Sequence, residues 1–136
     1  FDASGQLQRG KLADVVFSDS RKRKQLEDIL HPKITASWRA QIAEWKCGGV
    51  PLAVVVIPLL FETACEAEFQ TTVCIACSTH TQSERLRVRG WSDVEVGRRI
   101  AAQLSIEQKM SRSHRVIWSE GSLHALAEQV DRVFVP

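Results

Sequence analysis

The segment from Thr79 to Arg99, THTQSERLRVRGWSDVEVGRR, holds the densest group of chemically active side chains in the sequence. If it is helical, Gln82, Arg85 and Arg89 fall at positions i, i+3 and i+7 and share one face. A guanidinium can donate two parallel hydrogen bonds to phosphate oxygens, so such a row could neutralise a polyphosphate. The alternative is an exposed basic face whose arginines pair with nearby glutamates, and the spacing alone favours that alternative.

Two helices must position these arginines. Gly90 interrupts the first helical pattern, and the sequence SDVE at 92–95 is a capping box that starts a second helix. On the second helix Arg99 and Gln103 lie one turn apart, and Lys109 follows. A hinged pair of basic helices is typical of a lid that closes over a nucleotide and excludes water.

A second group of interest lies in VVVIPLLFE, where an apolar run meets a proline and then a carboxylate. The run Val50 to Ile57 is β-branched and too short for a buried helix, which predicts a strand covered on both faces. Ligands of open parallel sheets bind beyond the carboxyl ends of the strands, so Pro58 to Glu62 should face a site. The alternative is that Leu59 to Phe61 cap the core while Glu62 is solvated, and periodicity alone favours it.

The rest of the chain alternates between strand-like and helical patterns. Strands are predicted at 71–76 and 114–118, and helices at 11–17, 21–32, 33–46 and 122–134, with a cap at 18–20. Pro32 should end the second of these helices. The alternation predicts an α/β fold with a parallel sheet.

The composition bounds the function classes. The chain has 136 residues, 44% hydrophobic and 25% charged, as in one soluble globular domain, and its net charge of +2 is too small to indicate a nucleic-acid binder. The longest apolar run falls far short of the roughly 20 residues that span a bilayer. We expect a cytoplasmic protein that binds neither nucleic acid nor a membrane. Cys47, Cys65, Cys74 and Cys77 are expected to be free thiols, since no second pair completes a zinc site.

Several short motifs occur in a characteristic order. They are VFSD at 16–19, LHPKI at 30–34, PLLFE at 58–62, QxxRLxxR at 82–89, RIAAQ at 99–103, KxxxSHRVI at 109–117 and GSL at 121–123. Taken together, from Gly5 to Val133, they closely resemble the dephospho-coenzyme A kinases. The resemblance implies transfer of phosphate from ATP, with Mg²⁺, to the ribose 3′-hydroxyl of dephospho-CoA, the final step of coenzyme A biosynthesis. It also implies a parallel sheet like that of P-loop nucleoside-triphosphate hydrolases, with helical substrate and lid regions.

The resemblance also assigns roles to residues. The substrate-binding positions that it implies are His31, Pro58, Leu59, Leu60 and Glu62. The ATP phosphates would be bound by Gln82, Arg85, Arg89, Arg99, Gln103 and Lys109, and the loop beside the adenine would hold Trp118, Ser119 and Gly121. Considered alone, His31 would more often be a helix-end residue with a backbone partner. No catalytic residue and no metal ligand is expected within these 136 residues.

The resemblance divides the chain into four regions. These are a helical CoA- and substrate-binding region at 1–49, core strands with the substrate loop at 50–78, the lid and its return helix at 79–112, and the last core strand with the C-terminal helix at 113–136. The sequence departs from the family at three places. Val56 stands where many members have Asp, Ser113-His114 replaces Ala-Asp, and Trp118-Ser119 replaces Asp-Asn.

A phosphoryl-transfer enzyme of this kind needs a phosphate-binding loop, but no G-x-x-x-x-G-K-S/T motif occurs in the sequence. The chain also opens at Phe1 without a methionine. We therefore expect the C-terminal two thirds of such a kinase, inactive alone, whose partner is the N-terminal segment with the loop, the base and a strand between those at 50–57 and 71–76. The alternatives are a non-catalytic α/β module that binds nucleotide or CoA, and another P-loop kinase of nucleosides or nucleotides.

Overall fold

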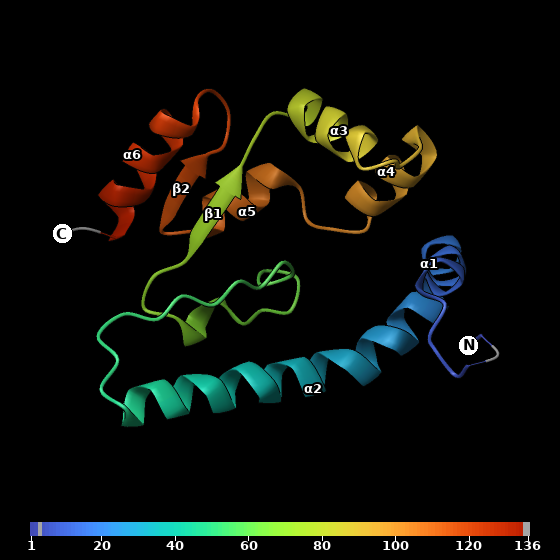
Figure 1. Ribbon diagram of the computed structural model, residues 1–136, viewed down its shortest axis with the longest axis horizontal. Coiled ribbons are helices and arrows are strands. Elements are labelled where there is room, and N and C mark those ends of the chain that lie inside the picture. Colours follow the sequence, from blue (N-terminus) through green and yellow to red (C-terminus); the bar gives the residue numbers. More distant parts are fainter. Residues whose placement is uncertain (3, 135–136) are drawn as a thin grey trace. The chain divides into compact units, whose positions relative to one another are not determined.

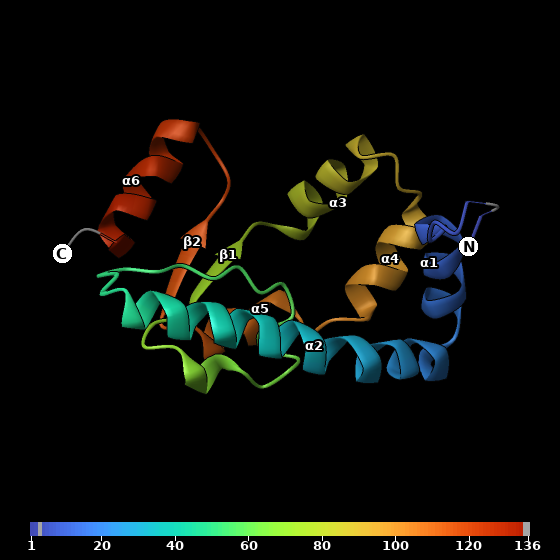
Figure 2. The ribbon, with the colours of Figure 1, turned by 60° about the horizontal axis from the view of Figure 1, so that its bottom comes forward.

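The computed structural model describes residues 1–2 and 4–134, and the chain separates into two compact units, Phe1–Pro58 and Leu59–Pro136. Figures 1 and 2 show the elements of each unit. Within the described residues, the first unit contains α1 (Arg9–Ser18) and α2 (Ser20–Cys47). The second contains a 3₁₀ turn η1 (Glu66–Glu68), β1 (Val73–Ala76), α3 (Thr79–Val88), α4 (Asp93–Ala101), α5 (Ile106–Arg112), β2 (Arg115–Trp118) and α6 (Leu123–Phe134). The four-region division of the sequence stays a prediction.

Helix α2 is 28 residues long and continues without interruption through Pro32. The prediction that Pro32 ends one helix and separates it from the next was wrong. A proline inside a helix costs about 3 kcal/mol, because it removes one N–H and crowds the preceding turn. Leu30 and Ile34 are four residues apart, so the two predicted apolar stripes are in phase across the proline, but both side chains are exposed and nothing in the structure explains how the cost is offset. No helix of the described residues, α2 included, is long and apolar enough to cross a membrane.

Asp19 starts α2 within the predicted cap region. Its Oδ1 accepts hydrogen bonds from the backbone N–H groups of Arg21 at 2.9 Å and Lys22 at 3.4 Å. These bonds satisfy donors that have no partner inside the helix.

Replacing this cap should weaken the first unit. We expect Asp19→Ala to lower the free energy of unfolding by about 1 kcal/mol, because the helix loses its N-cap acceptor. Asp19→Asn is the matched control, since asparagine caps helices about as well. Urea denaturation followed by circular dichroism measures both, and equal losses for the two variants would contradict the capping role.

The run from Val50 to Ile57 is irregular chain and not a strand. The prediction of a strand at 50–57 was therefore wrong for the described structure. Its β-branched residues favour extended backbone, but a strand also needs a neighbour to accept and donate its ladder hydrogen bonds. No strand of the described residues pairs with this run, and Val56 is 86% exposed instead of covered on both faces.

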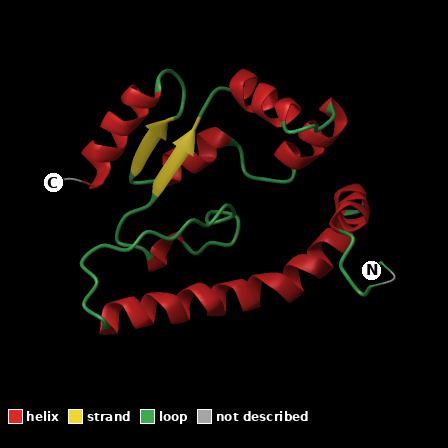
Figure 3. Ribbon diagram, in the orientation of Figure 1, coloured by secondary structure: helices red, strands yellow, loops and turns green. Residues whose placement is uncertain are grey.

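The strands β1 and β2 are parallel and pair from Val73 with Arg115 to Ala76 with Trp118. This confirms the strands predicted near 71–76 and 114–118 and the parallel α/β arrangement. Figure 3 shows the two strands in yellow. Helices α3, α4 and α5 form the connection between the strands, as parallel pairing requires a crossover. Helix α5 contacts β1, and α6 contacts β2.

The small core of the second unit lies at this sheet. Cys74, Ala76 and Ile117 are buried there, whereas Ile75 on the opposite face of β1 is 68% exposed. Cys74 is a free thiol whose pKa is raised by burial. The carboxyl ends of the two strands lead directly into the segments that carry the candidate functional residues.

Candidate functional site

A tight turn follows the PLLFE motif and fixes its carboxylate. The backbone N–H of Thr63 donates to the carbonyl of Leu59 at 3.0 Å, and that of Cys65 donates to Leu60 at 3.1 Å. Ala64 closes the turn at a φ of 52°, in the left-handed region. Phe61 is buried, with the Arg112 guanidinium 5.3 Å from its ring centre. The turn therefore anchors an aromatic ring and holds Glu62 beside it.

Glu62 lies in a polar network with the connection between α4 and α5. Its Oε1 accepts a hydrogen bond from the backbone N–H of Leu104 at 3.0 Å and lies 2.8 Å from the Nζ of Lys109. Lys109 also donates to the side-chain oxygen of Gln103 at 2.8 Å. The two charged side chains are only 17% and 14% exposed. Glu62 is thus not the solvated carboxylate of the alternative interpretation.

A second ion pair holds the same two segments together. Arg112, one turn after Lys109 on α5, pairs with Glu66 just beyond the turn. A backbone hydrogen bond, with the Arg112 side chain as a further donor, lowers the pKa of Glu66. Each pair leaves one buried carboxylate oxygen, Oε2 of Glu62 and Oε2 of Glu66, without a hydrogen-bond partner among the described residues. The turn at 59–65 and α5 are consequently joined through two carboxylates.

The three arginines of α3 have different surroundings. Arg85 donates to the Oγ of Ser119 at 3.0 Å and to its carbonyl at 2.6 Å. Arg87 points away and donates to Asp93 at 2.6 Å. Arg89, the C-cap of the helix, is exposed, and its side chain has no hydrogen bond or ion pair with any residue that the structure describes. Arg89 is therefore the guanidinium of this row that could receive a phosphate without breaking another contact.

Helix α4 begins at the predicted capping box. The Ser92 side chain accepts from the Glu95 backbone, and the Glu95 side chain accepts from the Ser92 backbone. A hydrogen bond from the Ser92 hydroxyl to the Glu95 carboxylate, with the one from the Ser92 backbone, lowers the pKa of Glu95. Arg99 lies over the ring of Trp91, 4.0 Å from its centre, in a cation–π arrangement. Helix α4 thus presents Arg99 stacked on an aromatic ring rather than extended into solvent.

The end of β2 and the loop that follows it hold the predicted adenine-side residues Trp118, Ser119 and Gly121. The backbone N–H of Trp118 donates to Gln129 at 2.8 Å, and its indole N–H donates to Oε2 of Glu120 at 3.2 Å. Gly121 adopts a φ of 92°. The structure brings this loop to α3 through Arg85.

Glu120 is a residue of this site that sequence reasoning missed. Its Oε1 accepts from the backbone N–H of Ser78 at 2.7 Å. Hydrogen bonds from Ser78 and Thr81 lower the pKa of Glu120 to about 2. Its position in the sequence could have indicated it. Glu120 follows one parallel strand closely, and the other strand ends at the same edge of the sheet, next to a serine that caps a helix.

The replacement of the family's Ala-Asp by Ser113-His114 has a structural explanation. The His114 Nδ1 accepts from the backbone N–H of the buried Thr72 at 3.1 Å, and the backbone N–H of His114 donates to the Thr72 carbonyl at the same distance. An imidazole nitrogen can take the acceptor role that a carboxylate oxygen would otherwise have.

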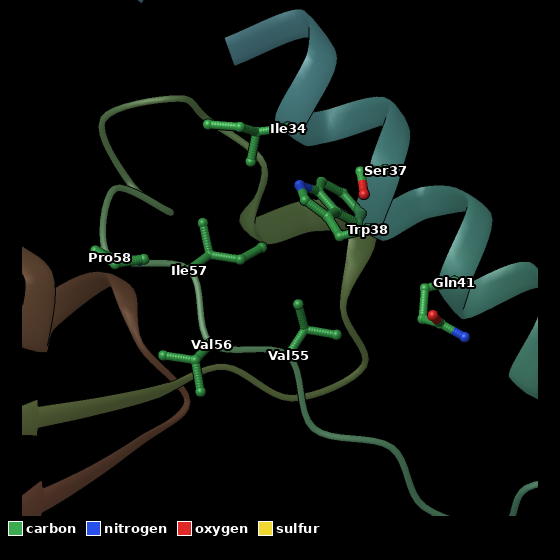
Figure 4. A pocket seen from close by; sticks show the side chains of 8 residues that line it. All are labelled: Ile34, Ser37, Trp38, Gln41, Val55, Val56, Ile57 and Pro58. Atoms are coloured by element: carbon green, nitrogen blue, oxygen red, sulfur yellow. The ribbon is translucent and has the colours of Figure 1, made fainter. Parts of the chain in front are cut away.

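The first unit carries an open apolar groove of about 400 Å³. Its walls are Ile34, Ser37, Trp38 and Gln41 of α2 and residues 55–58 of the following segment, as Figure 4 shows. Pro58 of the predicted substrate loop is part of this wall. His31 lies three residues before Ile34 on α2 and does not line the groove. Leu59 and Leu60 are half-buried in the second unit.

The predicted Mg²⁺ is not matched by ligands in this part of the protein. Among residues 1–2 and 4–134, no group of three or more His, Cys, Asp or Glu side chains gathers in a way that could hold a metal ion.

Comparisons with known proteins point to one family. A family model described as dephospho-CoA kinase matches residues 1–125. Dephospho-CoA kinases of Bdellovibrio bacteriovorus and Thermosynechococcus vestitus are each 37% identical to this chain over 131 residues, which make up 96% of the chain. The match covers 65% and 63% of those relatives, and 54% of a dephospho-CoA kinase from Symbiobacterium thermophilum. The chain thus spans little more than half to just under two thirds of these relatives.

Solved structures agree on the fold. A crystal structure from Thermus thermophilus superposes with a TM-score of 0.75 at 33% identity and covers 95% of this chain and 66% of that one. A dephospho-CoA kinase from Campylobacter jejuni superposes with a TM-score of 0.64 at 23% identity and covers 98% of this chain and 66% of that one.

Proposed function

Since this chain belongs to the dephospho-CoA kinase family, whose model matches residues 1–125, we propose that it carries the substrate turn and phosphate-binding helices of an enzyme that phosphorylates dephospho-CoA. The reaction is transfer of the terminal phosphoryl group of ATP to the ribose 3′-hydroxyl. The observation that best supports this function is the Glu62 network, because it joins the turn assigned to the acceptor to Gln103 and Lys109, which are assigned to ATP.

On the acceptor side, the proposed contacts are His31, Pro58, Leu59, Leu60 and Glu62. The turn supports this role by holding the backbone of the motif rigid around the buried Phe61. With Oε1 bound to Leu104 and Lys109, the carboxylate of Glu62 is fixed before substrate arrives. A fixed loop loses little conformational freedom on binding, which favours affinity.

On the ATP side, the proposed contacts are Gln82, Arg85, Arg89, Arg99, Gln103 and Lys109, with Trp118, Ser119 and Gly121 near the base. Phosphoryl transfer needs mainly positioning and neutralisation of charge. Arg89 suits that task because it is exposed and unpaired among the described residues, whereas Arg85 is held by Ser119. Mg²⁺ would supply further charge neutralisation when it is bound.

We also propose that a phosphate-binding loop outside these 136 residues completes the site, because the sequence contains no P-loop motif. In the complete fold the run at 50–57 would gain a strand partner and join β1 and β2 in a P-loop-type sheet. This would satisfy backbone groups that have no partner strand in the described structure.

A hybrid enzyme tests the function. It joins the part of the Bdellovibrio bacteriovorus dephospho-CoA kinase that this chain does not match to the complete 136-residue chain. We expect the hybrid enzyme to form CoA only when both ATP and dephospho-CoA are present, and the chain alone to form none. Chromatography of the products measures this.

Other outcomes of the assay would replace the proposal. Phosphorylation of a nucleoside or nucleotide, but not of dephospho-CoA, would indicate another P-loop kinase. Binding of dephospho-CoA or ATP by a folded hybrid enzyme without any transfer would indicate a non-catalytic binding module.

A further inference from the structure

Two separate contacts tie α3 to the loop between β2 and α6. At the start of the helix, Oε1 of Glu120 accepts from the backbone N–H of Ser78 at 2.7 Å. One to two turns later, Arg85 donates both to the side chain and to the carbonyl of Ser119, at 3.0 and 2.6 Å. We call these contacts of Ser78, Arg85, Ser119 and Glu120 the α3 clasp. They join residues 34 and 42 positions apart in sequence.

Of the two contacts, the hydrogen bond to Glu120 is harder for another acceptor to replace. Ser78 is the N-cap of α3, and its side-chain oxygen accepts from the backbone N–H of Thr81. The backbone N–H of Ser78 itself needs an acceptor from elsewhere. A carboxylate is the strongest acceptor for a backbone N–H and is further stabilised beside a helix N-terminus. Its second oxygen is held by the Trp118 indole N–H, which keeps the carboxylate oriented.

We propose that Glu120 is a positioning residue that, through the α3 clasp, fixes the direction of α3 and thereby the place of Arg89 at its far end. The role of Arg89 rests on the proposed function, but the clasp itself does not. A ten-residue helix is a rod of about 15 Å, so fixing its first turn and Arg85 leaves Arg89 little freedom. Gly90, whose φ is 87°, then separates α3 from α4.

Amide hydrogen exchange on the 136-residue chain tests the clasp without any nucleotide. Glu120→Ala should speed exchange of the Ser78 amide by about tenfold or more, the factor expected when a hydrogen bond to a charged group is lost. Glu120→Gln should restore much of the protection, because its amide oxygen can still accept. The Lys109 amide, bonded to Ser105 in α5, is the internal control and should not change.

The exchange experiment has a clear contrary result. Unchanged protection of the Ser78 amide in Glu120→Ala would overturn the clasp. Equal loss of protection at the Ser78 and Lys109 amides would also overturn it, since that would indicate general destabilisation. If the hybrid enzyme proved inactive, the proposed function would fail while this measurement would still decide the clasp.

Kinetics of the hybrid enzyme test the positioning of Arg89. Glu120→Ala should lower kcat more than it raises the KM for dephospho-CoA, and Glu120→Gln should recover most of the loss. In an Arg89→Ala background the same change should have less than half its effect, because both substitutions remove one interaction. Full, independent losses in the double variant would contradict action through Arg89.

Discussion

Arg89→Ala should lower kcat of the hybrid enzyme by about 10²- to 10³-fold and leave binding of dephospho-CoA nearly unchanged, as expected for loss of one charge-stabilising donor. The expectation rests on the exposure of Arg89, whose side chain has no hydrogen bond or ion pair among the described residues. A donor of this kind acts mainly where charge is redistributed on the transferred phosphoryl group. Steady-state kinetics with ATP and dephospho-CoA varied in turn give the separate constants.

Arg87→Ala is the matched control for this prediction. Arg87 has the same side chain on the same helix, but it donates to the exposed Asp93 and points off the face of Arg85 and Arg89. Removing an exposed ion pair should cost little. If Arg87→Ala and Arg89→Ala gave the same small loss, the arginine row would be an exposed basic face with no part in phosphate binding.

Glu62→Ala should lower the free energy of unfolding of the second unit by about 3 kcal/mol, because it leaves the largely buried ammonium of Lys109 without its carboxylate. It also removes the acceptor of the Leu104 N–H. Glu62→Gln should cost less, since its side-chain oxygen can still accept from Leu104. Urea denaturation followed by circular dichroism provides the values.

The control for Glu62 is Glu84→Ala. Glu84 pairs with His80 across one turn of α3, where both side chains are more than half exposed. Its loss should change stability by only a few tenths of a kcal/mol. A Glu62→Ala variant as stable as Glu84→Ala would show that the Glu62 network contributes little to holding the turn at 59–65 on α5.

Local patterns predicted those parts of the fold that depend on neighbouring residues. The β-branched run at 71–76 became β1, and the SDVE sequence became a capping box with both of its hydrogen bonds. The run at 50–57 is also rich in β-branched residues but has no strand beside it among the described residues, because propensity alone does not supply a hydrogen-bonding partner. At Pro32 a local rule failed, since α2 continues through the proline.

The family motifs supplied candidate residues, whose roles stay a prediction, but not the connections between them. The family motifs indicated Glu62, Gln103 and Lys109 as separate contacts for two substrates. Their meeting depends on how α5 packs beside the turn, and the bond from Leu104 to Glu62 crosses 42 positions. Glu120 was missed for the same reason, since nothing near it in sequence shows that it accepts from Ser78. Contacts of this range are set by the whole fold and not by any short pattern.

The position of the phosphate in the product of the hybrid enzyme tests the central claim most directly. The hybrid enzyme is supplied with ATP and dephospho-CoA, and phosphorus NMR of the purified product locates the new phosphate. Membership of the family, which rests on the match of residues 1–125, predicts a phosphate monoester at the ribose 3′-hydroxyl, giving CoA. A folded hybrid enzyme that placed phosphate at any other position, or that hydrolysed ATP without modifying dephospho-CoA, would contradict the account.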